Sequence, residues 1–335
     1  MKAVKWGILG AANFAQQHMA PAIHLAKGAE LYALATSHPD KATGFTDFCP
    51  GLKVHDSYDA LLADPNVEAV YIPLPNHLHV IWTLKAIAAG KHVLCEKPIA
   101  LHAREIEQII LARDASGLLV AEAYMIVHHP QWKRAREWVQ SGEIGRIRHV
   151  DAAFSFDIST AKDNIRNKPE TGGGSLRDIG VYTFGSMRFV TGAEPIELQA
   201  RMIRDNKIDS WAQVTGVMET GEAQGAKSRF TYSSMTSMRL PNRQEVTFQG
   251  ETGMIRLASA PFNANVHDVA EIELHKPAMT VRTERFPTDN HYVLQVEAFG
   301  RSLRTKEPYP CPLEFVRGTQ VMMDRAYGVA SDIRI

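Results

Sequence analysis

Short apolar segments alternate with segments of helical character over the first 124 residues, and this alternation restricts the fold more than any other feature. The apolar segments run from Val4 to Leu9, Glu30 to Ala35, Val67 to Ile72, Val93 to Cys95 and Leu118 to Ala123. Strands that are joined through helices run parallel, and the helices cover both faces of the sheet. The pattern therefore predicts an α/β domain with a doubly wound parallel sheet.

The first strand ends in a turn of small residues that is typical of dinucleotide-binding domains. The ideal pattern is GxGxxG, and the matching positions are Gly10, Ala12 and Ala15. Small residues let the backbone approach a pyrophosphate, while the helix N-terminus supplies N–H donors and a positive dipole. We therefore predict a Rossmann domain in which Gly10, Ala12, Asn13 and Phe14 contact the cofactor. Because alanines replace two of the glycines, an ordinary strand–turn–helix is the alternative.

The tip of the second strand lacks the carboxylate that usually meets a free ribose 2′-hydroxyl. Thr36, Ser37 and His38 stand there instead, and Lys41 follows. Hydroxyl, imidazole and ammonium groups suit a 2′-phosphate better, so these four residues predict NADP as the cofactor, with NAD left open. The same residues also fit the start of a helix. Asp40 would favour NAD if it reached the ribose.

The strand from Val93 to Cys95 runs into the sequence Glu96-Lys97-Pro98. Proline fixes φ and lacks an N–H donor, so the strand must end there. Lys97 is thereby placed on a rigid turn at the carboxyl end of a strand, the edge at which open α/β sheets bind ligands. A lysine held there can change its pKa and act on a proton. A surface lysine at a strand end is the alternative.

Residues 172–182, GGGSLRDIGVY, are the most informative part of the second half. Three glycines allow the backbone to approach a ligand or a partner chain closely. Ser175 then starts a helix on which Asp178 and Tyr182 share one face. As an alternative, Ser175-x-x-Asp178 is a capping-box pattern, and Tyr182 can be a core residue with its hydroxyl pointing outward.

Strands predominate from residue 147 onward. The predicted strands are Arg148 to Phe156, Ile196 to Ile203, Trp211 to Met218, Ala226 to Ser234, Arg243 to Gln249 and Met254 to Leu257. Their alternating apolar and polar residues suit a sheet with one covered face. We predict a dinucleotide-binding domain over residues 1–124 and a substrate-binding and oligomerisation domain of α+β type over residues 125–335.

The order and spacing of GILGAANFA, PLPNHLH and AGKHVLCEKP resemble the glucose–fructose oxidoreductase and inositol dehydrogenase family (Gfo/Idh/MocA). The stretches EAYMIVHHPQ and GGGSLRDIGVY resemble its branch of dimeric dihydrodiol dehydrogenase and NADP-dependent D-xylose dehydrogenases. The resemblance covers nearly the whole chain. It implies hydride transfer between nicotinamide and a sugar, polyol or related cyclic diol, of the aldose 1-dehydrogenase or trans-dihydrodiol dehydrogenase type. It also implies that the second domain carries a large open, predominantly antiparallel mixed sheet whose free face builds a homodimer or tetramer.

Lys97, Asp178 and Tyr182 are the predicted catalytic residues. Oxidising a sugar hydroxyl requires a base for its proton, and a tyrosine with a pKa of about 10 is a poor base near neutrality. A nearby ammonium favours the phenolate, and Lys97 is the candidate for that ammonium. Asp178 can hydrogen-bond the substrate hydroxyl or orient either of the other two side chains. The related inositol dehydrogenases have a histidine at the position of Tyr182.

Other site residues are carried over by resemblance alone. Leu74, Asn76 and His79 match the loop that runs along the cofactor, Glu96 the position beside the nicotinamide ribose, and Arg166 an arginine near the nicotinamide end.

Close relatives often have an arginine and an aromatic residue where this chain has Val127 and His128, so the substrate stays open. Arg177, Asp157 and His291 are further candidate substrate contacts. An NADPH-dependent sugar carbonyl reductase and a non-catalytic, dinucleotide-binding sugar sensor are the alternative functions.

The charge balance and the cysteines argue against other partners. Lys plus Arg and Asp plus Glu number 37 each, so no excess charge favours a nucleic acid or a membrane surface. Cys49, Cys95 and Cys311 are widely spaced, and no CxxC or HExxH pattern occurs. We therefore expect reduced thiols, no metal site and a cytoplasmic location.

Overall fold

The computed structural model describes residues 2–221, 227–266 and 268–334, which form two compact units. Unit 1 comprises Met1–His128 and Asn290–Arg317, and unit 2 comprises His129–Asp289 and Gly318–Ile335. The single predicted boundary after residue 124 does not describe the segment Asn290–Arg317, which packs with unit 1. Burial of aromatic surface explains this packing, because the side chain of Phe299 lies against Trp6 with ring centroids 4.9 Å apart.

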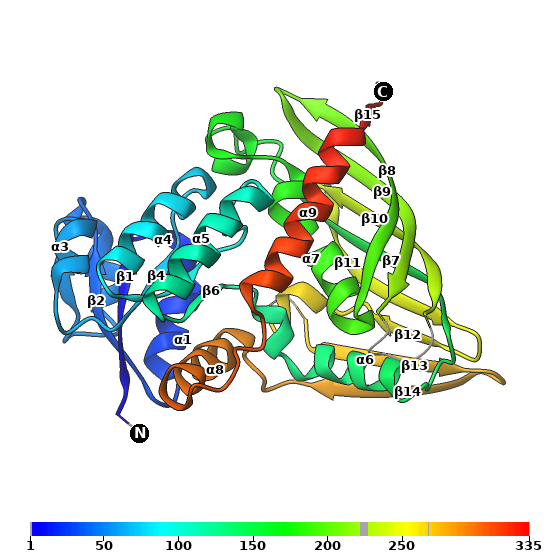
Figure 1. Ribbon diagram of the computed structural model, residues 1–335, viewed down its shortest axis with the longest axis horizontal. Helices are drawn as coiled ribbons and strands as arrows, with labels where there is room; N and C mark the ends of the chain where they lie inside the picture. The colour runs from blue at the N-terminus through cyan, green and yellow to red at the C-terminus, as the bar shows by residue number, and fades with distance from the viewer. Residues whose placement is uncertain (1, 222–226, 267, 335) are drawn as a thin grey trace. The chain divides into compact units, whose positions relative to one another are not determined.

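The described part of unit 1 contains a six-stranded sheet in the order β3-β2-β1-β4-β5-β6, with every pair parallel (Figure 1). Its strands are β1 (Val4–Leu9), β2 (Ala29–Ala35), β3 (Lys53–His55), β4 (Ala69–Ile72), β5 (His92–Cys95) and β6 (Val120–Glu122). The predicted doubly wound parallel sheet is confirmed. The chain order reverses between β1 and β4, and sheets of this kind bind ligands at the carboxyl ends beside such a reversal.

Helices and short helical turns connect the strands of unit 1. They are η1 (Ala15–Met19), α1 (Ala20–Leu25), η2 (Pro39–Ala42), α2 (Thr43–Thr46), α3 (Tyr58–Ala63), η3 (Asn76–Leu78), α4 (His79–Ala88), α5 (Ala103–Ser116), η4 (Met125–His128) and α8 (His291–Thr305). The helices α4 and α5 pack against each other, as do α1 and α8. The core of this unit includes the fully buried side chains of Trp6, Leu9 and Tyr71.

Within its described residues, unit 2 is built on a nine-stranded sheet in the order β14-β13-β12-β11-β7-β10-β9-β8-β15. Its strands are β7 (Ile147–Asp157), β8 (Ala193–Asp205), β9 (Ile208–Thr220), β10 (Arg229–Ser237), β11 (Arg239–Gly250), β12 (Met254–Leu257), β13 (Ala270–Lys276), β14 (Thr280–Phe286) and β15 (Ser331–Asp332). Most neighbours are antiparallel, while β7–β10 and β8–β15 are parallel. This confirms the predicted open, predominantly antiparallel mixed sheet. Ala226, at which one predicted strand begins, lies outside the described residues.

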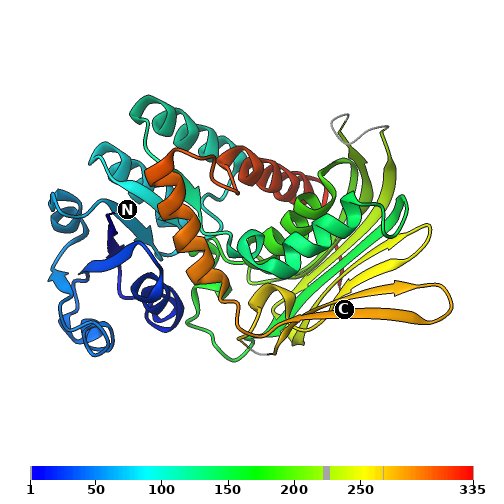
Figure 2. The ribbon, with the colours of Figure 1, turned by 90° about the horizontal axis from the view of Figure 1, so that it is seen from below.

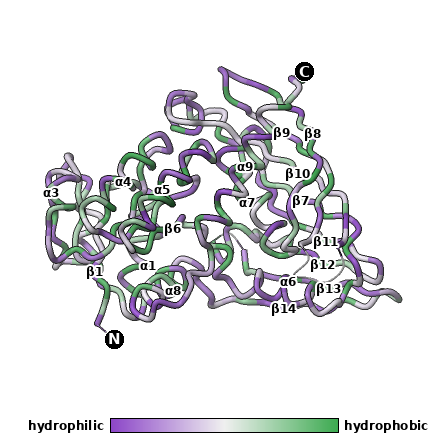
Figure 3. The backbone as a smooth tube through the Cα atoms, in the orientation of Figure 1, coloured by the Kyte–Doolittle hydropathy of each residue, from purple (hydrophilic) through white to green (hydrophobic). Residues whose placement is uncertain are grey.

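The helical segments of unit 2 are α6 (Pro130–Gln140), η5 (Ile165–Asn167), η6 (Pro169–Thr171), α7 (Ser175–Thr191) and η8 (Pro261–Asn263), and α9 (Leu313–Val329) enters this unit at Gly318. Figure 2 shows α6 and α7 on the same face of the sheet. Burial accordingly alternates along β10, and Figure 3 shows hydrophilic and hydrophobic segments mixed along the sheet of unit 2. Among the described helices, none is both long and apolar enough to cross a membrane.

Candidate functional site

Two carboxyl groups hold the corner that carries Lys97 in unit 1. Glu96 accepts a hydrogen bond from the Tyr71 hydroxyl at 2.6 Å through Oε1 and one from the Lys97 backbone N–H at 3.2 Å through Oε2. Glu122, at the end of β6, accepts a hydrogen bond from the Ile99 N–H at 3.0 Å. These hydrogen bonds fix the backbone on both sides of Lys97. Because Lys97 follows β5, it lies at the carboxyl edge of the parallel sheet.

Glu122 and Tyr71, which help to hold this corner, are buried away from water. Burial raises the pKa of Glu122, the Ile99 N–H and the Lys97 ammonium lower it, and Glu96 raises it; together these effects bring the pKa to about 7. Burial also raises the pKa of Tyr71 well above its usual value, with Glu96 adding to the effect. Tyr71 consequently stays protonated and keeps its hydrogen bond to Glu96.

His79 joins two loops at this edge. Its Nδ1 lies 2.7 Å from the Pro98 carbonyl oxygen, and its Nε2 lies 2.6 Å from the Leu74 carbonyl oxygen. The ring is 1% exposed, and burial lowers the pKa of His79 to about 4. A neutral imidazole has one N–H, so His79 donates to one of these two carbonyl oxygens and only contacts the other. The ring lies between Leu74, which precedes η3, and Pro98, which follows β5.

The glycine turn has the backbone that the dinucleotide motif requires. Gly10 has a φ of +110°, a conformation that side-chain-bearing residues rarely adopt, and an added Cβ would lie 3.1 Å from a methyl carbon of Leu74. Asn13 and Phe14 follow and are exposed. The Phe14 ring packs edge-on against Tyr292, with centroids 5.7 Å apart. Ala12, which precedes Asn13, is half-buried.

At the tip of β2, the predicted phosphate contacts differ in accessibility. Thr36 is buried, and its hydroxyl accepts from the His38 N–H at 3.2 Å and contacts the His38 carbonyl oxygen at 3.3 Å. Ser37, His38 and Lys41 are exposed, as is Asp40. His38 also stands at the N-cap of η2. The prediction that a helix starts here is thus correct. Ser37, His38 and Lys41 stay accessible to a ligand, while Thr36 is buried.

In unit 2, Asp178 is paired with Arg166. The Arg166 Nε donates to Asp178 Oδ2 at 2.8 Å, and Asp178 is 8% exposed. The capping-box alternative is wrong, because Ser175 donates instead to Asp209 at 2.8 Å. The N-cap residue is Gly174, which has no side chain to cap the helix. The N-cap therefore lies one position before the predicted capping residue, and the Asp178 carboxylate pairs with Arg166.

Tyr182 is one α-helical turn after Asp178 and is 6% exposed. Its ring centroid lies 5.7 Å from that of Phe154 and 5.5 Å from that of Phe262. The ring thus packs in the aromatic core between α7 and the sheet, as the core interpretation predicts. Such packing also fixes the direction of the phenol, which a proton-transfer group needs.

The weaker substrate candidates have structural partners. Asp157 accepts from the Ser159 N–H at 2.8 Å, and the Arg177 guanidinium lies 4.9 Å from the ring centroid of Tyr327. His291 is 1% exposed. The segment that departs from close relatives is buried too: Val127 is 1% exposed and His128 2% exposed.

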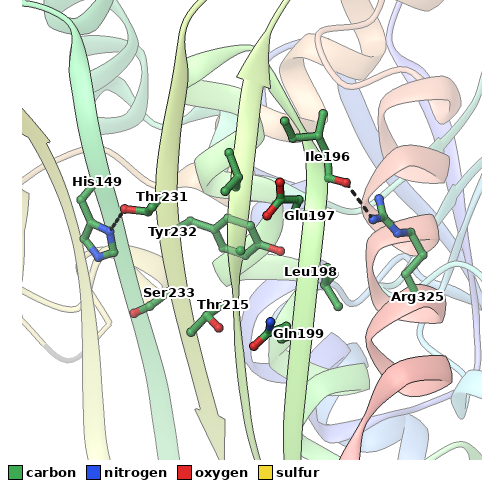
Figure 4. Close-up of a pocket in the computed structure, with 12 residues that line it drawn as sticks. His149, Ile196, Glu197, Leu198, Gln199, Thr215, Thr231, Tyr232, Ser233 and Arg325 are labelled. Atoms are coloured by element: carbon green, nitrogen blue, oxygen red, sulfur yellow. Dashed lines mark hydrogen bonds between the residues drawn. The ribbon is translucent and has the colours of Figure 1, made fainter.

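A hollow of about 680 Å³ lies on the sheet of unit 2 (Figure 4). It is lined by residues of β7, β8, β9 and β10 and by Arg325 of α9, among them the hydroxyl-bearing Thr215, Thr231 and Ser233. The predicted site residues do not line it. Over the described residues, no group of three or more His, Cys, Asp or Glu side chains is arranged to hold a metal ion.

Comparison with known proteins identifies the family. A model described as the oxidoreductase family with an NAD-binding Rossmann fold matches residues 4–124, and the GFO/IDH/MocA C-terminal domain matches residues 132–256. An uncharacterized oxidoreductase of Rhizobium meliloti is 36% identical over 97% of this chain and 96% of its own length. The chain belongs to the Gfo/Idh/MocA oxidoreductase family.

Further relatives of this Gfo/Idh/MocA protein have more specific names. D-xylose 1-dehydrogenase (NADP(+)) 2 of Haloferax volcanii is 34% identical over 90% of both chains. The crystal structure of a 3-ketoreductase from Actinomadura kijaniata, in complex with NADP and TDP-benzene, is 26% identical, covers 100% of both chains and has a TM-score of 0.87. The predicted family and enzyme class are confirmed.

Sequence reasoning missed Asp209, which contacts the start of α7, and Glu122, which holds the Lys97 corner. Glu122 lies near the end of the strand predicted from Leu118 to Ala123, which is a usable signal for a residue at the edge where such sheets bind ligands. Asp209 lies 34 and 33 residues from its partners Ser175 and Leu176 in α7, and no local pattern connects them.

Proposed function

We propose that this protein is an NADP-dependent oxidoreductase that transfers a hydride between nicotinamide and a sugar, polyol or related cyclic diol. The observation that carries the proposal is the Lys97 corner, which two carboxyl groups fix at the carboxyl edge of the parallel sheet. The xylose dehydrogenase relative and the NADP-bound ketoreductase support both the substrate class and the cofactor.

Each unit supplies part of the proposed chemistry. Tyr182 exchanges a proton with the substrate oxygen, and the Lys97 ammonium favours its phenolate form. Asp178, held by Arg166, accepts a hydrogen bond from a substrate hydroxyl. The nicotinamide accepts or donates the hydride when the cofactor is bound.

The proposed cofactor contacts lie along the same edge of unit 1. Gly10, Ala12, Asn13 and Phe14 would adjoin the pyrophosphate, where Gly10 has the backbone that such a turn needs. The exposed side chains of Ser37, His38 and Lys41 would contact the 2′-phosphate, with Thr36 shaping their turn. Further along, Leu74, Asn76, His79 and Glu96 form or fix the loops beside the nicotinamide half. Arg166, which belongs to unit 2, is proposed as a further contact near the nicotinamide end.

The second candidate is an NADPH-dependent sugar carbonyl reductase. The likeness to a 3-ketoreductase favours it, and the same residues serve the reverse reaction, because Tyr182 then donates the proton that it would otherwise accept. A sugar sensor without turnover is the remaining alternative.

Initial rates decide among these functions. We expect NADP-linked oxidation of aldoses or diols to exceed the NAD-linked rate, and Tyr182→Phe to lower kcat by about 10²–10⁴-fold with little change in cofactor affinity. Tyr232→Phe is the matched control, because the buried Tyr232 hydroxyl has no hydrogen-bond partner among the described residues.

Other results would separate the alternatives. Faster NADPH oxidation with keto sugars than NADP reduction with any aldose or diol would favour the reductase. Dinucleotide binding without turnover in either direction would favour the sensor. Full activity of Tyr182→Phe would remove this tyrosine from the mechanism.

A further inference from the structure

The helix that carries Asp178 and Tyr182 begins without a cap of its own. The N-cap position of α7 is Gly174, which has no side chain, although the N–H groups of a first helical turn need acceptors. The preceding residues cannot supply a side-chain acceptor either, since positions 172–174 are all glycine.

Asp209, at the start of β9, supplies the missing acceptor. Its Oδ2 accepts from the Leu176 backbone N–H at 2.6 Å and from the Ser175 hydroxyl at 2.8 Å. Asp209 is 1% exposed, so these hydrogen bonds are not replaced easily by water. A carboxylate from a distant strand thus performs the task that an N-cap side chain usually performs from within the helix.

The same carboxyl group is tied to other elements of unit 2. Its Oδ1 accepts from the Tyr327 hydroxyl of α9 at 2.6 Å. The Tyr327 ring lies beneath the Arg177 guanidinium, which belongs to the first turn of α7. On the other side, the Ser175 hydroxyl lies 3.0 Å from the Thr236 hydroxyl of β10. The start of α7 is therefore held by two strands and a second helix.

The glycines adapt the backbone to this arrangement. Gly174 has a φ of +124°, and a Cβ added to it would overlap Asp209 Oδ1. A Cβ on Gly173 would overlap the carbonyl oxygen of Arg166, the residue that pairs with Asp178. At these two glycines the close approach is to the unit's own residues, which corrects the expectation of a ligand or partner chain.

We propose that Asp209 is a positioning residue: by capping α7 from β9, it sets where Asp178 and Tyr182 are presented for the reaction. The proposal rests on the proposed function for its effect on turnover. Its effect on α7 does not depend on that function.

Three variants test the proposal. Asp209→Ala removes the acceptor, and Asp209→Asn keeps an oxygen for Leu176 and Ser175 while its amide can donate to the Tyr327 hydroxyl oxygen. Tyr327→Phe is milder, since it removes one donor to Asp209 and keeps the ring beneath Arg177. Tyr232→Phe, which deletes a buried hydroxyl without a described partner, is the matched control for Tyr327→Phe.

Two measurements apply to each variant, below its unfolding temperature. Hydrogen exchange at residues 175–178 should become about tenfold faster in Asp209→Ala, which is the loss of a helix cap, and return toward the wild-type rate in Asp209→Asn. At the same time kcat should fall about tenfold or more in Asp209→Ala, with the KM for NADP unchanged, because a small misplacement of catalytic groups slows the reacting step. Tyr327→Phe should show smaller changes of the same kind, and Tyr232→Phe none.

The outcomes distinguish this proposal from the proposed function. Unchanged exchange in both Asp209→Ala and Tyr327→Phe would overturn the positioning role. A lower unfolding temperature with an unchanged kcat per folded molecule would show that Asp209 serves stability only. If the wild-type protein has no activity on any substrate, the proposed function fails, and the exchange measurement still decides whether Asp209 caps α7.

Discussion

A single buried carboxyl group beneath the Lys97 corner makes the stability of unit 1 depend on pH. Burial raises the pKa of Glu122 from the ordinary 4.5 to about 7. Between these values the folded chain holds a proton that the unfolded chain has released, so a rise in pH across this window removes stability. Because one pKa unit corresponds to 1.36 kcal/mol, the loss above pH 7 is at most about 3 kcal/mol.

Glu122→Gln isolates this effect. The amide oxygen can still accept from the Ile99 N–H, but the side chain never becomes charged. We expect the variant to unfold at a higher temperature than the wild type at pH 8, and at a similar temperature at pH 4.5, where both side chains are neutral. Glu107→Gln is the control, since the Glu107 side chain is 58% exposed. Equal shifts at both pH values in thermal unfolding would contradict the prediction.

At the scale of the element, the start of α7 tolerates no side chain at its N-cap. Gly174→Ala introduces a Cβ at a φ of +124° that overlaps the Asp209 carboxylate, and we expect it to cost about 3 kcal/mol in the free energy of unfolding. Gly328→Ala in α9 is the matched control. No atom lies within 4 Å of its added Cβ, so it should stabilise the helix by up to about 1 kcal/mol. Urea denaturation of both variants measures the difference in their free energies of unfolding. Equal midpoints would show that the N-cap position of α7 tolerates a side chain.

The first helix shows how an element can depart from its predicted form. The sequence predicts a helix from the glycine turn toward His24, and the chain is indeed helical there, but η1 is a π-helical turn. Pro21, the second residue of α1, has no N–H to donate to the preceding turn, and its ring would crowd the carbonyl four residues earlier. A wider turn before the proline relieves this conflict. The proline is a local signal, so this feature was within reach of the sequence.

At the scale of the whole molecule, the sequence predicts the features that depend on neighbouring residues, and it does not predict those that depend on contacts between distant segments. The parallel sheet of unit 1 follows from apolar segments that alternate with helices, and the Lys97 corner follows from the proline beside it. The packing of Asn290–Arg317 with unit 1 and the cap by Asp209 could not be predicted, because each depends on contacts between segments far apart in the chain. The pairing of Asp178 with Arg166 had the same difficulty, although both residues were singled out separately.

The sheet of unit 2 also allows a prediction about oligomerisation. Strands β8, β9, β10 and β7 bring Glu197, Val217, Thr231 and His149 into one row across four strands, and all four line the hollow of Figure 4. We expect a homodimer or tetramer that buries this row. A two-fold interface meets each substitution twice, so Val217→Arg should shift the mass in light scattering toward the monomer. Val54→Arg, at an exposed valine of β3, should leave the mass unchanged. A monomeric wild-type protein, or a Val217→Arg variant of unchanged mass, would exclude assembly through this face.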